Sequence, residues 1–189
     1  MNFHIRQLAI PEVKLLKVEK FGDYRGFFSE TYSRRDMERS GINLEFVQDN
    51  QSFSASAGTL RGLHFQCAPF EQAKLVRVLR GRIWDVVVDI RNGSPTYGRH
   101  VAAEISAAEW NQILVPVGFA HGMLTLEPDT EVFYKVSNYY SADCDRGLLW
   151  SDPVLDIRWP MPASDLILSE KDERHPVLKD LPAYFRYCP

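Results

Sequence analysis

Two histidines in short glycine-containing segments are the residues of this sequence best suited to carry out chemistry. His64 belongs to residues 58–66 (GTLRGLHFQ), and His121 ends residues 116–121 (PVGFAH). Imidazole titrates near neutral pH, so it can take up or release a proton, or ligate a metal ion. The alternative is a pair of hydrogen-bonded core histidines. Two spaced motifs, with Lys74 between them, favour a shared site instead.

The two segments resemble the two motifs of the cupin superfamily, in which a glycine precedes His-x-His and Pro-x-Gly-x-x-His follows later. In metal-binding cupins these histidines and a glutamate surround one cation. Here Gln66 replaces the second histidine, and Lys74 stands at the carboxylate position, where its ammonium would repel a cation. We therefore expect acid–base chemistry with no metal and no cofactor. A metal-dependent cupin oxygenase or isomerase is the alternative that these two replacements disfavour.

The segments that must position these residues have the pattern of short β-strands. Turn residues interrupt the β-like runs at four places, 22–23, 92–95, 116–118 and 127–129. Asp85 and Asp89 alternate with the apolar residues of 84–90 and are expected on the opposite strand face. Tyr134 shares a face with Val132 and Val136, which by itself is typical of a core aromatic residue.

Helical patterns are few. Residues 33–39 fit a short helix with Ser33 as its cap, and residues 169–172 (SEKD) have the form of a capping box that begins another. The pattern predicts an all-β sandwich or barrel. The cupin resemblance narrows this to a double-stranded β-helix, or jelly roll, with a few short helices.

Composition limits the class of protein. The chain has 189 residues, which suits one domain spanning 1–189. Its 22 basic and 25 acidic side chains give a formal charge of −3, which argues against nucleic acid and anionic membranes as partners. No stretch is apolar enough for a signal peptide or a bilayer span, so we expect a cytoplasmic protein. Cys67, Cys144 and Cys188 form no CxxC pair, and we expect reduced thiols.

Six segments, in order, cover nearly the whole chain and resemble the dTDP-4-dehydrorhamnose 3,5-epimerase family. They are residues 22–30 (GDYRGFFSE), 46–50 (FVQDN), 60–66 (LRGLHFQ), 118–122 (GFAHG), 134–135 with 138–140 (YK and NYY), and 168–172 (LSEKD). The resemblance implies epimerisation of a dTDP-linked 4-keto-6-deoxy sugar at carbons 3 and 5 through an enolate. The product would be dTDP-4-dehydro-L-rhamnose, in dTDP-L-rhamnose biosynthesis.

The resemblance also implies roles for single residues. His64 would be the base, with Asp172 fixing its tautomer, and Tyr134 would be the acid on the opposite face. Lys74 would stabilise the enolate, and His121 would assist at the carbonyl. The alternative for Asp172 is that it only completes the capping box.

Substrate contacts are implied for a larger set on the same ground, namely Arg25, Phe28, Glu30, Gln48, Asn50, Arg61, His121, Tyr140 and Lys171. Arg61 suits a diphosphate, because a guanidinium binds oxyanions in a bidentate manner. Strict alternation would put Arg61 on the strand face opposite His64, so we expect a bulge or bend at Gly62. A homodimer with exchanged N-terminal strands is implied, so some contacts are expected from the partner subunit.

Departures from the family pattern at Gln51, Met123 and Asp145 bear on substrate shape more than on reaction type. A single-position epimerase acting on a related nucleotide keto-sugar is one alternative. A non-catalytic cupin that binds a sugar nucleotide is another. Because a binding module needs no opposed acid and base, the joint presence of His64, Tyr134 and Asp172 favours the enzyme.

Overall fold

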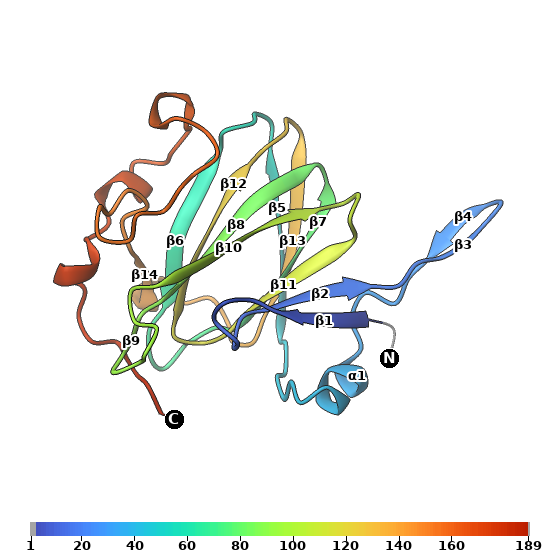
Figure 1. Ribbon diagram of the computed structural model, residues 1–189, viewed down its shortest axis with the longest axis horizontal. Coiled ribbons are helices and arrows are strands. Elements are labelled where there is room, and N and C mark those ends of the chain that lie inside the picture. The colour runs from blue at the N-terminus through green and yellow to red at the C-terminus, as the bar shows by residue number, and fades with distance from the viewer. Residues whose placement is uncertain (1–2, 189) are drawn as a thin grey trace.

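The computed structural model describes residues 3–188 and consists mainly of two antiparallel β-sheets that face each other (Figure 1). The larger sheet has the strand order β1 (Phe3–Gln7), β2 (Lys14–Val18), β11 (Asn111–Val115), β7 (Lys74–Arg80), β13 (Thr130–Val136) and β5 (Gln48–Ser54). The smaller sheet has the order β10 (His100–Ser106), β8 (Arg82–Asp89), β12 (Phe119–Thr125), β6 (Leu60–Gln66) and β14 (Asp145–Gly147). Both histidine motifs therefore end in neighbouring strands of one sheet, as the predicted cupin-type all-β fold requires.

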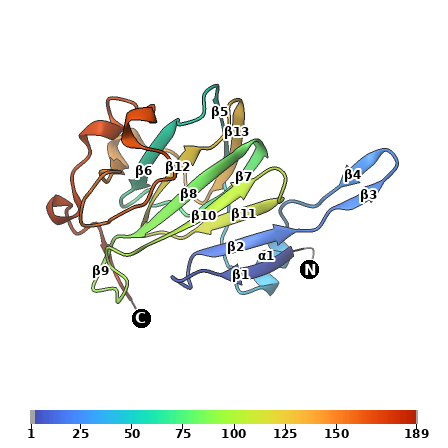
Figure 2. The same ribbon diagram turned by 45° about the horizontal axis from the view of Figure 1, so that its top comes forward.

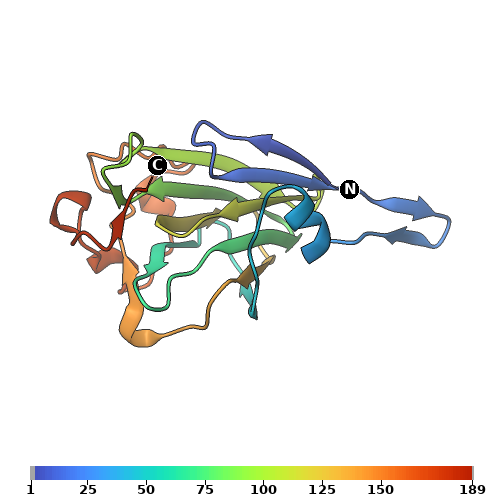
Figure 3. The ribbon, with the colours of Figure 1, turned by 90° about the horizontal axis from the view of Figure 1, so that it is seen from below.

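Two short strand pairs lie outside these sheets. A hairpin is formed by β3 (Phe21–Asp23) and β4 (Gly26–Phe28), and β9 (Arg91–Asn92) pairs in parallel with β15 (Phe185–Arg186). The hairpin projects well away from the sheets, as Figure 3 shows.

Helical structure is limited, as predicted. The α-helix α1 (Arg34–Arg39) begins after Ser33, whose hydroxyl accepts the backbone N–H of Asp36. The other helical elements are single 3₁₀ turns, η1 (Ala142–Cys144), η2 (Ala163–Asp165), η3 (Asp172–Arg174) and η4 (Leu178–Asp180). The predicted C-terminal helix is thus only one turn, η3. Within residues 3–188, no helix has the length and apolar character needed to cross a membrane.

Strand β8 is buried on both faces. Ile83 and Val87 belong to the core between the two sheets, and Asp85 lies on that same face. Val86 and Val88 point the other way, into a second apolar cluster beneath the C-terminal segment. Figures 1 and 2 show this segment lying beside β6 and β14. The predicted alternation is confirmed, and it places a carboxylate inside the barrel.

Three of the four predicted turns are present, but the one at residues 22–23 is wrong. Gly22 and Asp23 belong to β3, and the hairpin turns at Tyr24 and Arg25. The carboxylate of Asp23 accepts the backbone N–H of Arg25 at 2.8 Å, which fixes a turn of the aspartate type. Gly26 then adopts a φ of 136°, which side-chain-bearing residues rarely reach.

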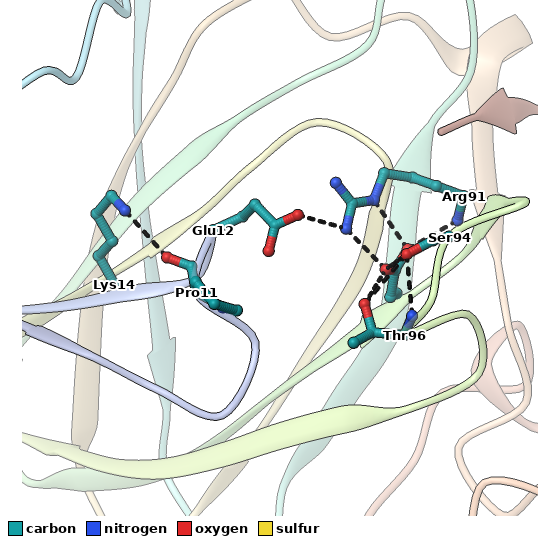
Figure 4. Close-up of polar contacts among 7 residues, drawn as sticks. Pro11, Glu12, Lys14, Arg91, Ser94 and Thr96 are labelled. Atoms are coloured by element: carbon teal, nitrogen blue, oxygen red, sulfur yellow. Dashed lines mark hydrogen bonds and ion pairs between the residues drawn. The ribbon is translucent and has the colours of Figure 1, made fainter. Parts of the chain in front are cut away.

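A buried ion cluster ties the loop between β1 and β2 to the end of β8 (Figure 4). Asp89 is fully buried and accepts hydrogen bonds from Arg91, from Ser94 at 2.6 Å and from Thr96 at 2.6 Å. The Arg91 guanidinium reaches Asp89 at 2.7 Å and Glu12 at 2.9 Å. Because both charges of the Asp89–Arg91 pair are paired and hydrogen-bonded, their burial is tolerated.

Candidate active site

A cavity of about 500 Å³ opens between the two sheets, and the predicted catalytic residues all line it. His64 enters from β6 of the smaller sheet, whereas Tyr134 and Lys74 enter from β13 and β7 of the larger sheet. Asp172 enters the cavity from the C-terminal segment. Three predicted substrate contacts line the same cavity, namely Arg61, His121 and Lys171.

A bulge in β6 brings Arg61 to the same side as His64. His64 pairs with His121 on β12 and Arg61 pairs with Met123, so two residues of β6 lie opposite Gly122 alone. Gly62 makes this possible, because its φ is 130° and a Cβ there would lie 2.5 Å from the Gly122 Cα. The bulge expected at Gly62 is therefore present.

His64 and Asp172 form a hydrogen-bonded pair. The Nε2 of His64 donates to Oδ1 of Asp172 at 2.5 Å, which leaves Nδ1 as the nitrogen able to accept a proton. The Ser169 hydroxyl accepts the backbone N–H of Asp172 at 3.2 Å. The capping interaction and the histidine pairing, offered by the sequence as alternatives, therefore coexist.

Burial and hydrogen bonding set the protonation of this pair. Burial lowers the pKa of His64 and Lys74 lowers it further, while Asp172 and Asp145 act against them. For Asp172, burial would raise the pKa, but the nearby imidazoles of His175 and His64 and the Ser169 hydroxyl outweigh it and hold the pKa well below its usual range. The pair is thus a neutral imidazole beside a carboxylate at neutral pH.

The opposite wall carries a phenol and an ammonium. Burial raises the pKa of Tyr134, with Asp145 adding to this and Arg61 opposing it, so the phenol keeps its proton. The half-buried Lys74 side chain lines the cavity, and its ammonium donates a hydrogen bond to the His64 carbonyl oxygen at 3.4 Å. That burial lowers the pKa of Lys74 to about 8, against the attraction of Asp85 and Asp145.

A second histidine–carboxylate pair lies beside the first. The Nε2 of His121 contacts Oδ2 of Asp85 at 2.8 Å, and Asp85 is fully buried on β8. The other oxygen of Asp85 has no hydrogen-bond partner among the described residues. The sequence predicts only the strand face of Asp85, not its place in the site. The feature that could have pointed to the site is a carboxylate within the apolar run of β8.

A smaller hollow of about 180 Å³ adjoins the cavity and shares His64, Lys74 and Tyr134 with it. The predicted contacts Gln48, Asn50 and Tyr140 line it, together with Asp145. The Gln48 side chain accepts the Tyr140 backbone N–H at 3.2 Å and donates to Asn50 at 2.9 Å. The Tyr140 ring remains exposed at the rim.

Gln66, at the position of a metal-ligating histidine in metal-binding cupins, holds two loops together. Its amide donates to the carbonyls of Phe70 at 2.6 Å and Tyr139 at 3.0 Å and accepts the Ser141 N–H at 2.7 Å. These bonds fix the segment that carries Tyr140. Because the loops engage both the oxygen and the nitrogen of this amide, Gln66 is poorly suited to ligate a cation in the cavity.

One group of described residues has donor atoms close enough to share a metal ion. His64, Asp172 and His175 each offer one such atom within 4.8 Å of the others. Two of the three atoms are already joined in the His64–Asp172 hydrogen bond. With the Lys74 ammonium beside His64, the set is better suited to proton transfer than to a divalent cation.

Comparison with known proteins agrees with this geometry. The family model described as dTDP-4-dehydrorhamnose 3,5-epimerase matches residues 7–180. A dTDP-4-dehydrorhamnose 3,5-epimerase of Sinorhizobium fredii is 50% identical over 186 residues, which cover 98% of this chain and 95% of the relative. The chain belongs to the dTDP-4-dehydrorhamnose 3,5-epimerase family. The predicted family and the predicted enzyme class, an isomerase, are confirmed.

Solved structures of epimerases in this family have the same fold. The enzyme of Bacillus anthracis, determined with TDP and pyrophosphate bound, has a TM-score of 0.89 and 48% identity and covers 93% of this chain and 99% of its own. The Legionella pneumophila enzyme in complex with dTDP-4-keto-L-rhamnose has a TM-score of 0.93 and 39% identity. It covers 99% of this chain and 100% of its own.

Three predicted contacts of the epimerase site do not line the cavity of their own chain. Arg25 and Phe28 lie on the projecting β3–β4 hairpin, and Glu30 follows it. Arg25 pairs with Asp23 at 2.5 Å, and Phe28 is 70% exposed. The single chain therefore assembles the acid–base part of the site but leaves these three residues outside it.

Proposed function

We propose that this chain epimerises a dTDP-linked 4-keto-6-deoxy sugar at carbons 3 and 5, giving dTDP-4-dehydro-L-rhamnose. The observation that carries this is the pair of opposed proton carriers, since His64 and Tyr134 reach one cavity from facing sheets. Inversion of a carbon needs removal of a proton from one face and delivery to the other. Relatives of the same fold were determined with TDP or with dTDP-4-keto-L-rhamnose bound.

In this mechanism His64 removes the proton beside the ketone. Its Nε2 is held by Asp172, so Nδ1 takes the proton, and the carboxylate stabilises the imidazolium that results. The lowered pKa of His64 keeps the ring unprotonated before the reaction. The electron pair released from the C–H bond moves onto the ketone oxygen and forms an enolate.

Lys74 and Tyr134 complete the inversion. The Lys74 ammonium provides positive charge for the enolate oxygen, with His121 assisting from β12 of the facing sheet. Tyr134 then delivers its proton to the carbon from the face opposite His64, and its raised pKa keeps that proton available. Carbons 3 and 5 flank the same ketone, so one set of groups serves both when the sugar is presented twice.

The nucleotide extends from the cavity toward its rim. Arg61 and Lys171 supply positive charge for the diphosphate at the cavity wall. The exposed ring of Tyr140 stacks on the base, and Gln48 and Asn50 lie beside it with amides that can form hydrogen bonds.

We further propose a homodimer in which the β3–β4 hairpin of one subunit completes the site of its partner. Every residue of β3 and β4 is exposed, and the hairpin carries large apolar side chains, with Tyr24 at 96% exposure and Phe27 at 56%. Such a surface is typical of an interaction site. Exchange would bring Arg25, Phe28 and Glu30 to a cavity that they do not reach in their own chain.

The free thiols Cys67, Cys144 and Cys188 fit a cytoplasmic protein.

Proton exchange with solvent tests the reaction. Incubation with dTDP-4-keto-6-deoxy-glucose in heavy water should place deuterium at carbons 3 and 5, with conversion to the L-configured sugar, as followed by NMR. Label at one carbon only would mean a single-position epimerase, and no label from folded protein would overturn the proposal. His64→Asn should lower the rates of both exchange and inversion by roughly 100-fold or more. Tyr134→Phe should still exchange protons through His64 but should lose inversion.

Subunit mixing tests the exchanged hairpin. His64→Asn and Arg25→Glu should each inactivate the homodimer, but co-expression should restore activity, because a mixed dimer contains one site with both residues intact. Statistical assembly predicts about one quarter of the wild-type sites. The matched control is co-expression of His64→Asn with Tyr134→Phe, which places a defect in every site and should recover nothing. Equal recovery in both mixtures, or none in either, would refute the exchange.

A further inference from the structure

His175 has a buried nitrogen without a hydrogen-bond partner, close to the His64–Asp172 pair. The residue follows η3, and its side chain is 9% exposed. Its Nε2 lies 3.5 Å from Oδ1 of Asp172, the oxygen that accepts the hydrogen bond from His64, and has no hydrogen-bond partner among the described residues. Buried polar atoms are nearly always satisfied, so this exception calls for a physical account.

The ring is held in place by a notch in strand β14. Gly147 pairs with His64 across the β14–β6 ladder, and a Cβ at Gly147 would lie 2.2 Å from the Nε2 of His175. The next residue, Pro176, accepts a hydrogen bond from the backbone N–H of Leu149 at 2.8 Å, which anchors the chain there. The notch exists only because residue 147 has no side chain.

His175 also contacts the proposed base directly. The imidazole rings of His64 and His175 pack edge to face, with centroids 5.5 Å apart and an interplanar angle of 82°. The Asp172 carboxylate therefore has one imidazole hydrogen-bonded to Oδ1 and a second imidazole just beyond hydrogen-bond distance of the same oxygen. A movement of about 0.3 Å would complete the hydrogen bond between His175 and Asp172.

We propose that His175 is a positioning residue for the His64–Asp172 pair, donating a second hydrogen bond to the carboxylate and fixing its orientation toward His64. This rests on the proposed function in which His64 is the base. A carboxylate shared between two donors stabilises the His64 imidazolium less than a carboxylate that serves His64 alone. His175 thereby keeps His64 a weaker base that is already unprotonated when the sugar binds.

The direction of the pH effect follows from the charges around His64. Asp172 from the C-terminal segment and Asp145 from β14 favour its charged form, and Lys74 from β7 disfavours it. Removing His175 frees the Asp172 carboxylate, so the pKa of His64 should rise. Because the base must be unprotonated, the acidic limb of the kcat/KM profile should move to higher pH.

The test compares His175→Ala with His175→Asn, whose amide keeps a donor near the carboxylate. NMR titration of the His64 ring in the substrate-free protein should show a pKa about half a unit higher in His175→Ala, with partial return in His175→Asn. The kcat for epimerisation should fall about tenfold in His175→Ala with KM little changed. The acidic limb of the kcat/KM profile should shift by the same amount as the pKa of His64 measured by NMR.

Unchanged titration and an unchanged pH profile in both variants would overturn the positioning role. Should His175→Ala fail to fold, Gly147→Ala, which displaces the ring, and His175→Asn give the same comparison of His64 titration. The NMR measurement needs no substrate. A wild-type protein without epimerase activity would therefore refute the proposed function, while the His64 titration would still decide whether His175 acts on the pair.

Discussion

Replacement of Lys74 by methionine should stabilise the protein while inactivating it. Burial lowers the pKa of Lys74 from 10.5 to about 8, which means that the fold disfavours the charged ammonium. At about 1.4 kcal/mol for each tenfold change in proton affinity, the cost at neutral pH is about 3 kcal/mol. Methionine has a similar volume and no charge, so Lys74→Met should gain up to that amount. The nearby carboxylates keep other partners, since Asp85 contacts His121 and Asp145 contacts Lys171.

The pH dependence of this gain has a definite sign. A lysine with a depressed pKa in the folded state binds fewer protons than the unfolded chain between about pH 8 and the unfolded value of 10.5. Stability of the wild type should therefore rise with pH in this window. The advantage of Lys74→Met should be full at about pH 7 and nearly gone at about pH 10.5. Urea unfolding of both proteins, at one protein concentration and at both pH values, measures this difference in the free energy of unfolding.

Activity supplies the other half of the test. Loss of the charge near the enolate should lower kcat by roughly 100-fold to 1,000-fold in Lys74→Met. Lys74→Arg is the matched control, because a guanidinium stays charged throughout the accessible range. The wild type should lose kcat/KM as pH rises through about 8, the pKa of Lys74, and this limb should disappear in Lys74→Arg. A Lys74→Met protein that is less stable than wild type at neutral pH, or retains its kcat, would refute the reasoning.

Three further outcomes follow from the structure. Gly62→Ala should lower the free energy of unfolding, measured by urea denaturation, by about 2 kcal/mol more than Gly26→Ala. Both glycines have similar φ, but only a Cβ at Gly62 would clash with the adjacent strand β12. Asp89→Asn should lower the free energy of unfolding by about 3 kcal/mol at neutral pH. The donors around Asp89 hold its pKa low against burial, so the deficit of Asp89→Asn relative to the wild type should shrink as pH falls below 3.8. Asp172→Asn should lower kcat by roughly 1,000-fold, with the acidic limb of kcat/KM moving to lower pH, because His64 loses the carboxylate that favours its charged form.

Much of the site could be predicted because its residues occur in motifs that local structure keeps together. Alternation in β8 and β13 placed Asp85 and Tyr134 on the correct faces, since a strand has only two. The expected bulge at Gly62 rested on the same periodicity, because Arg61 and His64 cannot share a face without an extra residue between them. That residues 1–189 form one domain stays a prediction.

Other features depend on contacts between segments far apart in the chain, which a periodic pattern does not encode. The His121–Asp85 pair joins two strands, and the contact of His175 with Asp172 depends on space left by Gly147. The turn at residues 22–23 was misplaced because glycine and aspartate favour turns, whereas here the Asp23 side chain caps the turn that follows it.

Burial alone gives two of the four proposed catalytic groups, His64 and Tyr134, the protonation state that their roles need. It disfavours every charged form, so it lowers the pKa of His64 and of Lys74 and raises that of Tyr134. A neutral base and a neutral acid result without any specific partner. Asp172 needs specific partners, because burial would protonate it and only its hydrogen bonds keep it charged. Lys74 must stay charged against the same burial, and a pKa of about 8 leaves it mostly protonated at neutral pH. Among these groups, the environment of Lys74 therefore sets the upper pH at which the enolate can be stabilised.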